Sequence, residues 1–350
     1  MDSRPVSIKD VADRAGVAIG TVSNVLNHPA RVSAATRERV QGAIDDLGFV
    51  RNDAARQLRA GQSRTIGLIV LDVGNPFFSS LARAAEDCAA ENGSTVVLGD
   101  SGQDAGREAR YIDVFEQQRV QGMLISPVGD VGARVEALRK RGMPVVLVDR
   151  VDPQRRCSSV SVDDVAGGYM AVRHLLAAGR RRIVFVGTRA DYRQVADRLT
   201  GARQAVEEHD GAVLEVVEAD AMTVLAGRDV GEAIAQRRAG ELPDGIFCAN
   251  DLLAIGVMQA VLLIRGLRIP EDLALIGYDD IDFSASAVVP LTSVRKPTEL
   301  MGRTAVELLL EEIERPDSRR RQVIFDPELV ERGSTTAPAP VAGSPAPAGG

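Results

Sequence analysis

The sequence predicts a two-part protein, with a small all-α head followed by a larger α/β body built on parallel sheets. The head is indicated by three short helical patterns within the first fifty residues, each with a start or stop signal. The body is indicated by aliphatic runs that alternate with amphipathic helical stretches from Thr65 onward. The length of 350 residues exceeds one ordinary domain and agrees with two or three units.

Capping residues divide the head into its helices. Ser7 is expected to cap the first helix, with Asp10 as its capping-box partner. A second helix is expected at about 18–27, after a gap of only a few residues, which is the length of a helix-turn-helix corner. Ser33 is expected to cap a third helix that ends at Gly48.

The outward face of the second helix has small and amide side chains, which allow a helix to approach base edges and phosphates closely. They are Ile19, Gly20, Thr21, Ser23, Asn24 and Asn27. On spacing alone, a solvated face of an unrelated small bundle is an equal alternative, because helix-turn-helix patterns recur by chance.

Charge is divided unevenly along the chain. Residues 1–64 carry ten basic and seven acidic side chains, a net charge of +3, whereas the whole chain has a formal net charge of −7. A mildly basic head on an acidic body agrees with a DNA-binding head.

The literal residues of the head resemble the LacI/GalR family of bacterial transcriptional regulators over about sixty contiguous positions. The segments that carry the resemblance are 6–12, 15–17, 21–27, 32–40 and 47–49. The resemblance implies that Ile19, Gly20 and Asn24 read bases. It implies contacts to the DNA backbone from Ser7, Thr21, Ser23, Asn27, Ser33 and Thr36. The sequence departs from the family at Ala18, where a serine is usual.

The segment from Asn52 to Arg59, followed by Gly61, resembles the hinge helix of the same family. Eight residues are too few for a stable isolated helix, so the segment is expected to order only with a partner. The resemblance implies that Leu58 is a wedge in the minor groove and that Ala55 permits close approach. A plain frayed linker is the alternative.

The body is predicted to contain strands that alternate with helices. The strands are expected at 66–71, 95–98, 122–126, 145–149, 183–187, 245–248 and 274–278. The helices are expected near 77–92, 104–119, 131–141, 164–178, 192–209, 222–239 and 250–265. Their number suits two parallel sheets, each covered on both faces.

Polar residues follow several of these strands, where parallel sheets bind ligands. Segments such as 75–78, 149–150, 163–164, 250–251 and 278–279 offer carboxylates, amides and aromatic walls that suit a sugar or similar polar ligand. Taken singly, each residue is better explained as a helix cap or turn residue, and it is their joint position at strand ends that favours a ligand site.

The body also resembles the LacI/GalR family, more loosely, through segments 74–78, 148–150, 167–171, 198–201, 247–251 and 276–280. The resemblance implies a periplasmic-binding-protein-like body with two lobes and a cleft. The residues that match effector-facing positions are Phe77, Phe78, Asp149, Arg198, Asn250 and Asp279.

The expected domains are a head at 1–51, a hinge and linker at 52–64, a body at 65–333 and a disordered tail at 334–350. Within the body, one lobe is expected to hold about 65–162 and 290–320, and the other about 163–289 plus the C-terminal segment.

No cofactor, metal site or membrane span is expected. The three cysteines and three histidines are scattered without metal-ligand spacing, and neither a P-loop nor a dinucleotide fingerprint is present. No apolar run reaches the roughly 18 residues that a membrane-spanning helix needs, and no signal-peptide pattern is found, so a cytoplasmic location is expected.

The predicted function is a sequence-specific repressor that binds a pseudo-palindromic double-stranded DNA operator as a homodimer. A small effector in the cleft (a sugar, sugar derivative or nucleoside) would control it. Three rival functions predict different observations. A transport binding protein would be secreted, an enzyme would turn over a bound sugar, and an architectural DNA-binding protein would show no thermal shift with any sugar or nucleoside.

Overall fold

The computed structural model describes residues 6–49, 63–188 and 192–336. The chain divides into two compact units, residues 1–63 and 64–350. The first is the head and the second is the body.

Within residues 6–49, the head is a bundle of three α-helices. These are α1 (Ile8–Ala15), α2 (Ile19–Asn27) and α3 (Ala34–Leu47), with a 3-10 turn η1 (Pro29–Arg31) before α3. The capping predictions are confirmed: Ser7 and Asp10 form a capping box, Ser33 accepts a hydrogen bond from the Thr36 amide, and Gly48 ends α3 in the left-handed conformation. The buried residues that hold the helices together are Val11, Ala12, Ala15, Val22, Val25, Val40 and Ala43.

The hinge prediction lies outside the described residues. It covers 52–61 and includes Ala55 and Leu58.

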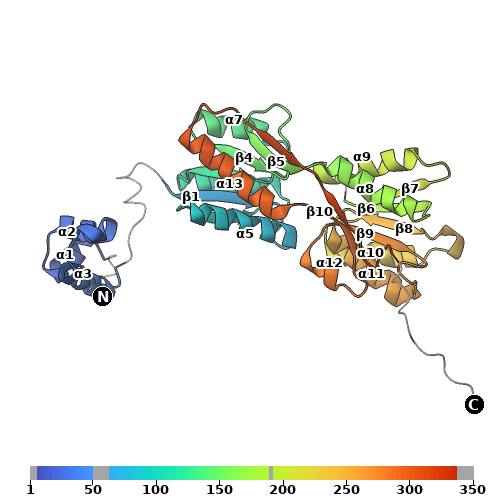
Figure 1. Cartoon of the computed structure of the whole chain (residues 1–350), viewed down its shortest axis with the longest axis horizontal. Coiled ribbons are helices and arrows are strands. Elements are labelled where there is room, and N and C mark those ends of the chain that lie inside the picture. The colour runs from blue at the N-terminus through green and yellow to red at the C-terminus, as the bar shows by residue number, and fades with distance from the viewer. Residues whose placement is uncertain (1–5, 50–62, 189–191, 337–350) are drawn as a thin grey trace, which may run out of the picture. The chain divides into compact units, whose positions relative to one another are not determined.

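The body contains two six-stranded sheets, which define lobe 1 and lobe 2 (Figure 1). The lobe 1 sheet has the order β11-β5-β4-β3-β1-β2 and is parallel throughout. Its strands are β1 (Thr65–Val70), β2 (Thr95–Asp100), β3 (Gly122–Ile125), β4 (Val145–Val148), β5 (Ser158–Val162) and β11 (Gln322–Phe325). Its helices are α5 (Pro76–Glu91), α6 (Ala105–Gln117), α7 (Gly132–Lys140) and α13 (Thr298–Glu314).

The lobe 2 sheet has the order β12-β10-β9-β8-β6-β7, and only the β10–β12 pair is antiparallel. Its strands are β6 (Arg182–Gly187), β7 (Val213–Glu218), β8 (Gly245–Cys248), β9 (Ala274–Asp279), β10 (Thr292–Arg295) and β12 (Glu328–Val330). Its helices are α8 (Asp164–Ala177), α9 (Arg193–Glu207), α10 (Val224–Ala235), α11 (Asp251–Arg265) and α12 (Asp282–Ser286), with a 3-10 turn η2 (Ala239–Glu241).

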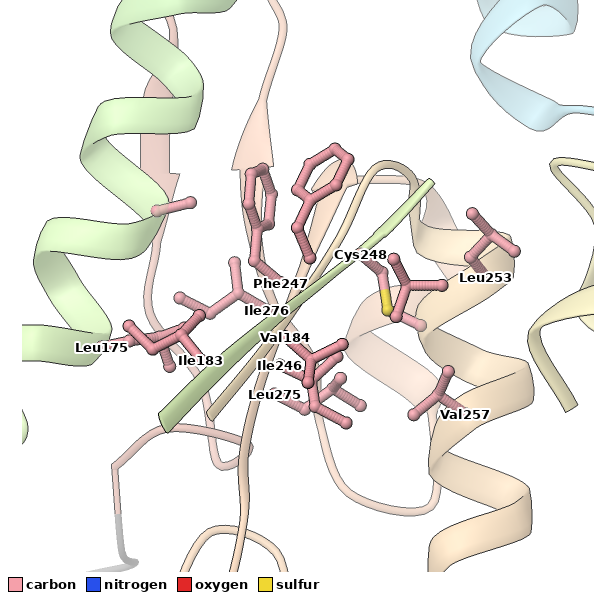
Figure 2. Packing of buried hydrophobic residues seen from close by; sticks show 14 of the residues in the cluster. Leu175, Ile183, Val184, Ile246, Phe247, Cys248, Leu253, Val257, Leu275 and Ile276 are labelled. Carbon is pink, nitrogen blue, oxygen red and sulfur yellow. The ribbon is translucent and has the colours of Figure 1, made fainter. Parts of the chain in front are cut away.

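Both faces of each sheet are covered, as the aliphatic strands predict. In lobe 1, Leu124 and Val146 belong to the cluster with α5 and α13, while their neighbours Met123 and Val145 belong to the cluster with α6 and α7. Figure 1 shows α13, from late in the chain, beside α5 from the start of the body. Figure 2 shows the lobe 2 core, where side chains of β6, β8 and β9 lie between Leu175 of α8 and Val257 of α11.

In the described part of the body, the chain crosses between the lobes three times. It crosses after β5, after β10 and after β11. The second crossing lies later than the expected position near 290, because Thr292–Arg295 pairs with β9 of lobe 2 before α13 returns to lobe 1.

The expectation of a disordered tail from Ser334 is wrong for its first residues. Ser334 is fully buried, its hydroxyl donates to the Leu275 carbonyl at 2.5 Å, and its own carbonyl accepts from the Leu275 amide at 2.9 Å. These contacts with β9 give the segment partners that its composition does not reveal.

Candidate functional site

The exposed side of the head is the outer face of α2. Ile19 is 43% exposed, and Gly20, Asn24 and Asn27 are also exposed, whereas Val22 on the opposite side is fully buried. Thr21 and Ser23 are half-buried at the edges of this face. The six residues predicted for this face therefore lie together on one exposed side of a single helix.

The start of α2 is open to an anion. Ala18 stands at the N-cap, makes no side-chain capping hydrogen bond, and leaves the first amides of α2 uncovered by its own side chain. No atom lies within 4 Å of the position where a Cβ would stand at Gly20, so a DNA surface can approach the helix closely. Helix N-termini attract phosphate because of their amides and dipole.

The hydroxyls predicted to contact the DNA backbone stand at two other helix starts. Ser7 donates to Asp10 at 2.6 Å, and Ser33 donates to the Thr36 hydroxyl at 2.9 Å. These side chains stabilise α1 and α3 as caps, which is also the role that the sequence alone would give them.

The candidate ligand site is a cavity of about 60 Å³ at the carboxyl ends of strands from both sheets. All six residues predicted to face an effector line it: Phe77, Phe78, Asp149, Arg198, Asn250 and Asp279. Asp149 directly follows β4, Asn250 follows β8, and Asp279 ends β9. Two lobes therefore supply the wall of one site.

Asn250 has two roles in this arrangement. Its side-chain oxygen accepts from the Leu253 amide at 2.9 Å and so caps α11. Its amide nitrogen donates to the Met222 carbonyl at 3.1 Å, and the residue still borders the cavity. The position of Asn250 is thus compatible both with a helix cap and with a ligand-binding residue.

Lys296 joins two carboxylates of the cavity, and the sequence analysis did not select it. Its ammonium lies 3.3 Å from Asp149 and 3.1 Å from Asp279, and its side chain is 1% exposed. The same nitrogen lies 3.3 Å from the centroid of the Phe77 ring. A sequence signal did exist, because Lys296 is one of only three lysines in an arginine-rich chain and directly follows a strand.

Two amides add hydrogen bonds between the lobes. Asn75 of lobe 1 donates to Asp279 of lobe 2 at 3.2 Å. Gln194 of lobe 2 donates to the Asp149 carbonyl at 2.8 Å and to its carboxylate at 3.2 Å. Together with Lys296, these side chains hold the two walls of the cavity together.

Arg198 is anchored on three sides. Its Nε donates to Asp164 at 2.8 Å, its Nη1 donates to the Ala249 carbonyl at 2.5 Å, and its guanidinium carbon lies 3.7 Å from the centre of the Tyr278 ring. Burial by itself would lower the pKa of Arg198, but Asp164 and the other nearby acidic groups raise it overall. The guanidinium therefore stays charged and fixed beside the cavity.

Two glycines permit this position of Arg198. A Cβ at Gly168 of α8 would lie 1.9 Å from the Arg198 carbonyl oxygen, and a Cβ at Gly201 of α9 would lie 1.8 Å from the Val165 carbonyl oxygen. Only glycine allows the two helix backbones to approach this closely.

The two carboxylates that Lys296 joins lie on strained backbone. Asp149 has φ 57° and Asp279 has φ 101°, a region that L-residues with side chains rarely adopt. Burial raises the pKa of Asp149, whereas Lys296 opposes that rise. Strain and desolvation at these two positions are typical of a binding site rather than of ordinary turns.

The cavity can accept and donate hydrogen bonds at close spacing. Carboxylates and amides can pair with hydroxyl groups, and Phe77 and Phe78 form an apolar corner with ring centroids 4.9 Å apart. Within the described residues, no group of three or more acidic, cysteine or histidine side chains could hold a metal ion. In the same parts of the chain, no helix is both long and apolar enough to traverse a lipid bilayer.

Comparison with known proteins places the chain in a family. Residues 7–52 match the profile of bacterial regulatory proteins of the lacI family, and residues 172–335 match a periplasmic binding protein-like domain. The HTH-type transcriptional repressor PurR of Aliivibrio fischeri is 32% identical over 337 residues, which cover 94% of this chain and 98% of that protein.

The chain belongs to the lacI family. It is a transcriptional regulator rather than an enzyme, in agreement with the sequence analysis.

Solved structures of lacI-family proteins share both parts of the chain. The lac repressor dimer bound to operator and the anti-inducer ONPF is 28% identical with a TM-score of 0.80, and the match covers 95% of this chain and all of that chain. The complex of the transcriptional regulator CelR with cellobiose is 30% identical with a TM-score of 0.67 and has the same coverage. The predicted fold class of this lacI-family chain is therefore confirmed.

Proposed function

We propose that this lacI-family chain is a homodimeric repressor whose affinity for an operator is set by a small polar ligand in the cavity between its lobes. The observation that carries the proposal is the convergence of Phe77, Phe78, Asp149, Arg198, Asn250 and Asp279 on one cavity. Membership of the family does not itself assign these side chains a role, and the proposal is that they bind the ligand.

The DNA-binding part of the proposal rests on the exposed face of α2. Asn24 offers the amide that can pair with adenine, and Ile19 offers apolar contact to a thymine methyl group. The residues assigned to the DNA backbone are Ser7, Thr21, Ser23, Asn27, Ser33 and Thr36, and those of the hinge are Ala55 and Leu58. The protein would act in the cytoplasm, where its operator lies.

Two copies are needed because each head reads few bases. Joining two weak contacts on a pseudo-palindrome raises the affinity through effective concentration. The lobe 1 sheet supplies a surface for pairing, since its edge strand β2 leaves Val97 and Leu98 exposed at 38% and 43%. Exposed apolar side chains on an edge strand are typical of a contact with another chain. The lac repressor is itself described as a dimer on its operator.

Ligand control follows from the position of the cavity. A ligand held by both lobes stabilises one relative placement of the lobes, and this shifts operator affinity by the difference in ligand affinity between the two states. A sugar fits the carboxylates, amides and aromatic corner, and the related CelR was solved with cellobiose.

The test begins with selection of a preferred duplex from a random library with the full-length protein. Operator affinity is then measured by fluorescence anisotropy with and without sugars, sugar derivatives and nucleosides that raise the melting temperature. The proposal expects an inverted-repeat operator and at least one ligand that lowers operator affinity. A monomer without preference for inverted repeats, or ligands that leave operator affinity unchanged, would contradict it.

A further inference from the structure

We propose that the cavity between the lobes favours an uncharged polyhydroxyl ligand over phosphorylated or carboxylated ones, and that Lys296 sets its preference for an uncharged ligand over one that carries an ammonium group. The inference rests on the proposed function, in that it names the charge class of the ligand for the same site.

The first argument is that both cations of the cavity are already paired. Lys296 lies between Asp149 and Asp279, at 3.3 and 3.1 Å, and is almost completely buried. Arg198 is held by Asp164 at 2.8 Å and by the Ala249 carbonyl, and its side chain is 4% exposed. Each cation is therefore already compensated by a buried carboxylate, and an anionic ligand adds a negative charge with no uncompensated cation of the cavity to balance it.

The second argument is the sign of the remaining charge. The cavity lining in the described residues has three carboxylates, those of Asp72, Asp149 and Asp279, against two cations, Lys296 and Arg198. The carboxylate of Asp164 stands behind Arg198 and adds to the negative side. A phosphate or carboxylate group of a ligand would therefore lie among negatively charged side chains in a region of low dielectric constant. Electrostatic repulsion is only weakly screened there.

The third argument concerns hydrogen-bonding capacity. Hydroxyl groups can donate to Asp149 and Asp279 and accept from Asn75 or Gln194, whereas a fully ionised phosphate can only accept. The cavity of about 60 Å³ is also much smaller than the roughly 300 Å³ at the lower end of ligand pockets, so a ligand must displace side chains or move the lobes apart. Lys296 covers the Phe77 ring at 3.3 Å, and a sugar that packs on that ring must therefore move the ammonium.

Lys296 is the specificity residue because it neutralises two carboxylates that come from opposite lobes. Without its ammonium, Asp149 and Asp279 would share an uncompensated negative charge, and the site would favour a ligand that brings its own ammonium group. Substitution of this residue should therefore change the charge preference in a predictable direction.

The experiment uses the full-length protein and matched sets of ligands. One set is glucose, glucose 6-phosphate, glucuronate and glucosamine, and galactose and mannose supply parallel sets. Affinities are measured by calorimetry for the wild type, Lys296→Met and the control Lys140→Met. Lys140 lies on α7 with its side chain 75% exposed. Its substitution therefore removes the same charge at a solvent-exposed position that does not line the cavity.

For the wild type, the proposal expects at least one neutral sugar to bind, with its phosphate and uronate at least tenfold weaker. For Lys296→Met, the ratio of amino-sugar affinity to neutral-sugar affinity should rise at least tenfold, while Lys140→Met leaves this ratio unchanged. Circular dichroism of Lys296→Met checks that it folds, and the wild-type comparison holds whether or not that variant does.

Three results would overturn the inference: a phosphate or uronate that binds the wild type as tightly as its parent sugar, no binding by any neutral sugar, or an unchanged amino-sugar ratio in folded Lys296→Met. Failure of the proposed function has a different signature. In that case a neutral sugar binds with the expected preference but leaves operator affinity unchanged.

Discussion

The contact between α8 and α9 gives a sharp test of how the fold positions Arg198. In Gly201→Ala, the added methyl group would lie 1.8 Å from the Val165 carbonyl oxygen and 2.6 Å from the Tyr169 amide nitrogen. Both neighbours are backbone atoms, so no side chain can rotate away to make room. The two helices must separate by about 1 Å or more to restore an ordinary contact.

The expected loss of stability follows from this geometry. Inserting a methyl group into a packed contact usually costs about 1–3 kcal/mol, and a clash with backbone belongs at the upper end. A loss of about 3 kcal/mol in a domain of this size lowers the melting temperature by roughly 6–12 °C. Arg198 lies one turn before Gly201 on α9, so its guanidinium should also shift from Asp164, and ligand affinity should fall.

Thermal unfolding is followed by far-UV circular dichroism, because the chain has no tryptophan. The matched control is Gly240→Ala, since no atom lies within 4 Å of the added methyl group and its φ is not in the left-handed region. The control should unfold close to the wild-type temperature. If Gly201→Ala and Gly240→Ala melted within about 1 °C of each other, the argument from close helix approach would be refuted.

Three further predictions concern the head and the buried carboxyl of lobe 2. Asn24→Ala should weaken operator binding by about 1–3 kcal/mol for each half-site and relax base preference at one position, whereas Gln41→Ala on α3 should bind as the wild type does in anisotropy titrations. Gly42→Ala should stabilise α3 by about 0.5–1 kcal/mol, because Gly42 is exposed, lies inside the helix, and leaves open space around an added methyl group. Urea unfolding measures this change, and a lower urea midpoint than that of the wild type would contradict the prediction. Burial, and then Asp279, raise the pKa of Asp251 to about 7, although hydrogen bonds from Ser293, Ser284 and the Ile281 amide lower it. The native state thus holds a proton that the unfolded chain releases, so this group's contribution to stability is present below about pH 4 and lost as pH rises toward 7. The urea midpoint of Asp251→Asn should show a weaker decline between pH 5 and 7 than that of the wild type, and equal slopes would count against the assignment.

Local sequence signals were sufficient for the head. Ser7, Asp10, Ser33 and Gly48 each act through contacts within a few residues of themselves, and the structure has these caps where the pattern predicts them. The same holds for the aliphatic strands β1, β3 and β4, whose composition agrees with burial on both faces.

Other elements escaped the sequence analysis because their environment comes from distant parts of the chain. β5 (Ser158–Val162) contains three serines, and its burial comes from β4 and β11 beside it and α13 packed against it. β10 belongs to lobe 2 because it pairs with β9, so the chain returns to lobe 1 later than the sequence analysis expected. Ser334 was assigned to a disordered tail from composition, yet its hydrogen bonds to Leu275 place it in the core.

The candidate site shows the same division. Phe77, Asp149 and Asn250 were predicted from the family resemblance and from their positions at strand ends, and these residues do line one cavity. Lys296 was missed because its importance depends on two carboxylates that are 147 and 17 positions earlier in the chain. The roles of these residues in ligand binding stay predictions.

The sequence by itself determined the helices of the head, the parallel character of the body and the family, because caps, periodicity and motif residues act over short distances. Only the tertiary structure decided which residues meet across the cleft, where the chain changes lobes, and that Lys296 lies between Asp149 and Asp279. The physical reason is that ion pairing and burial depend on distances in space, which chain folding sets and spacing along the sequence does not.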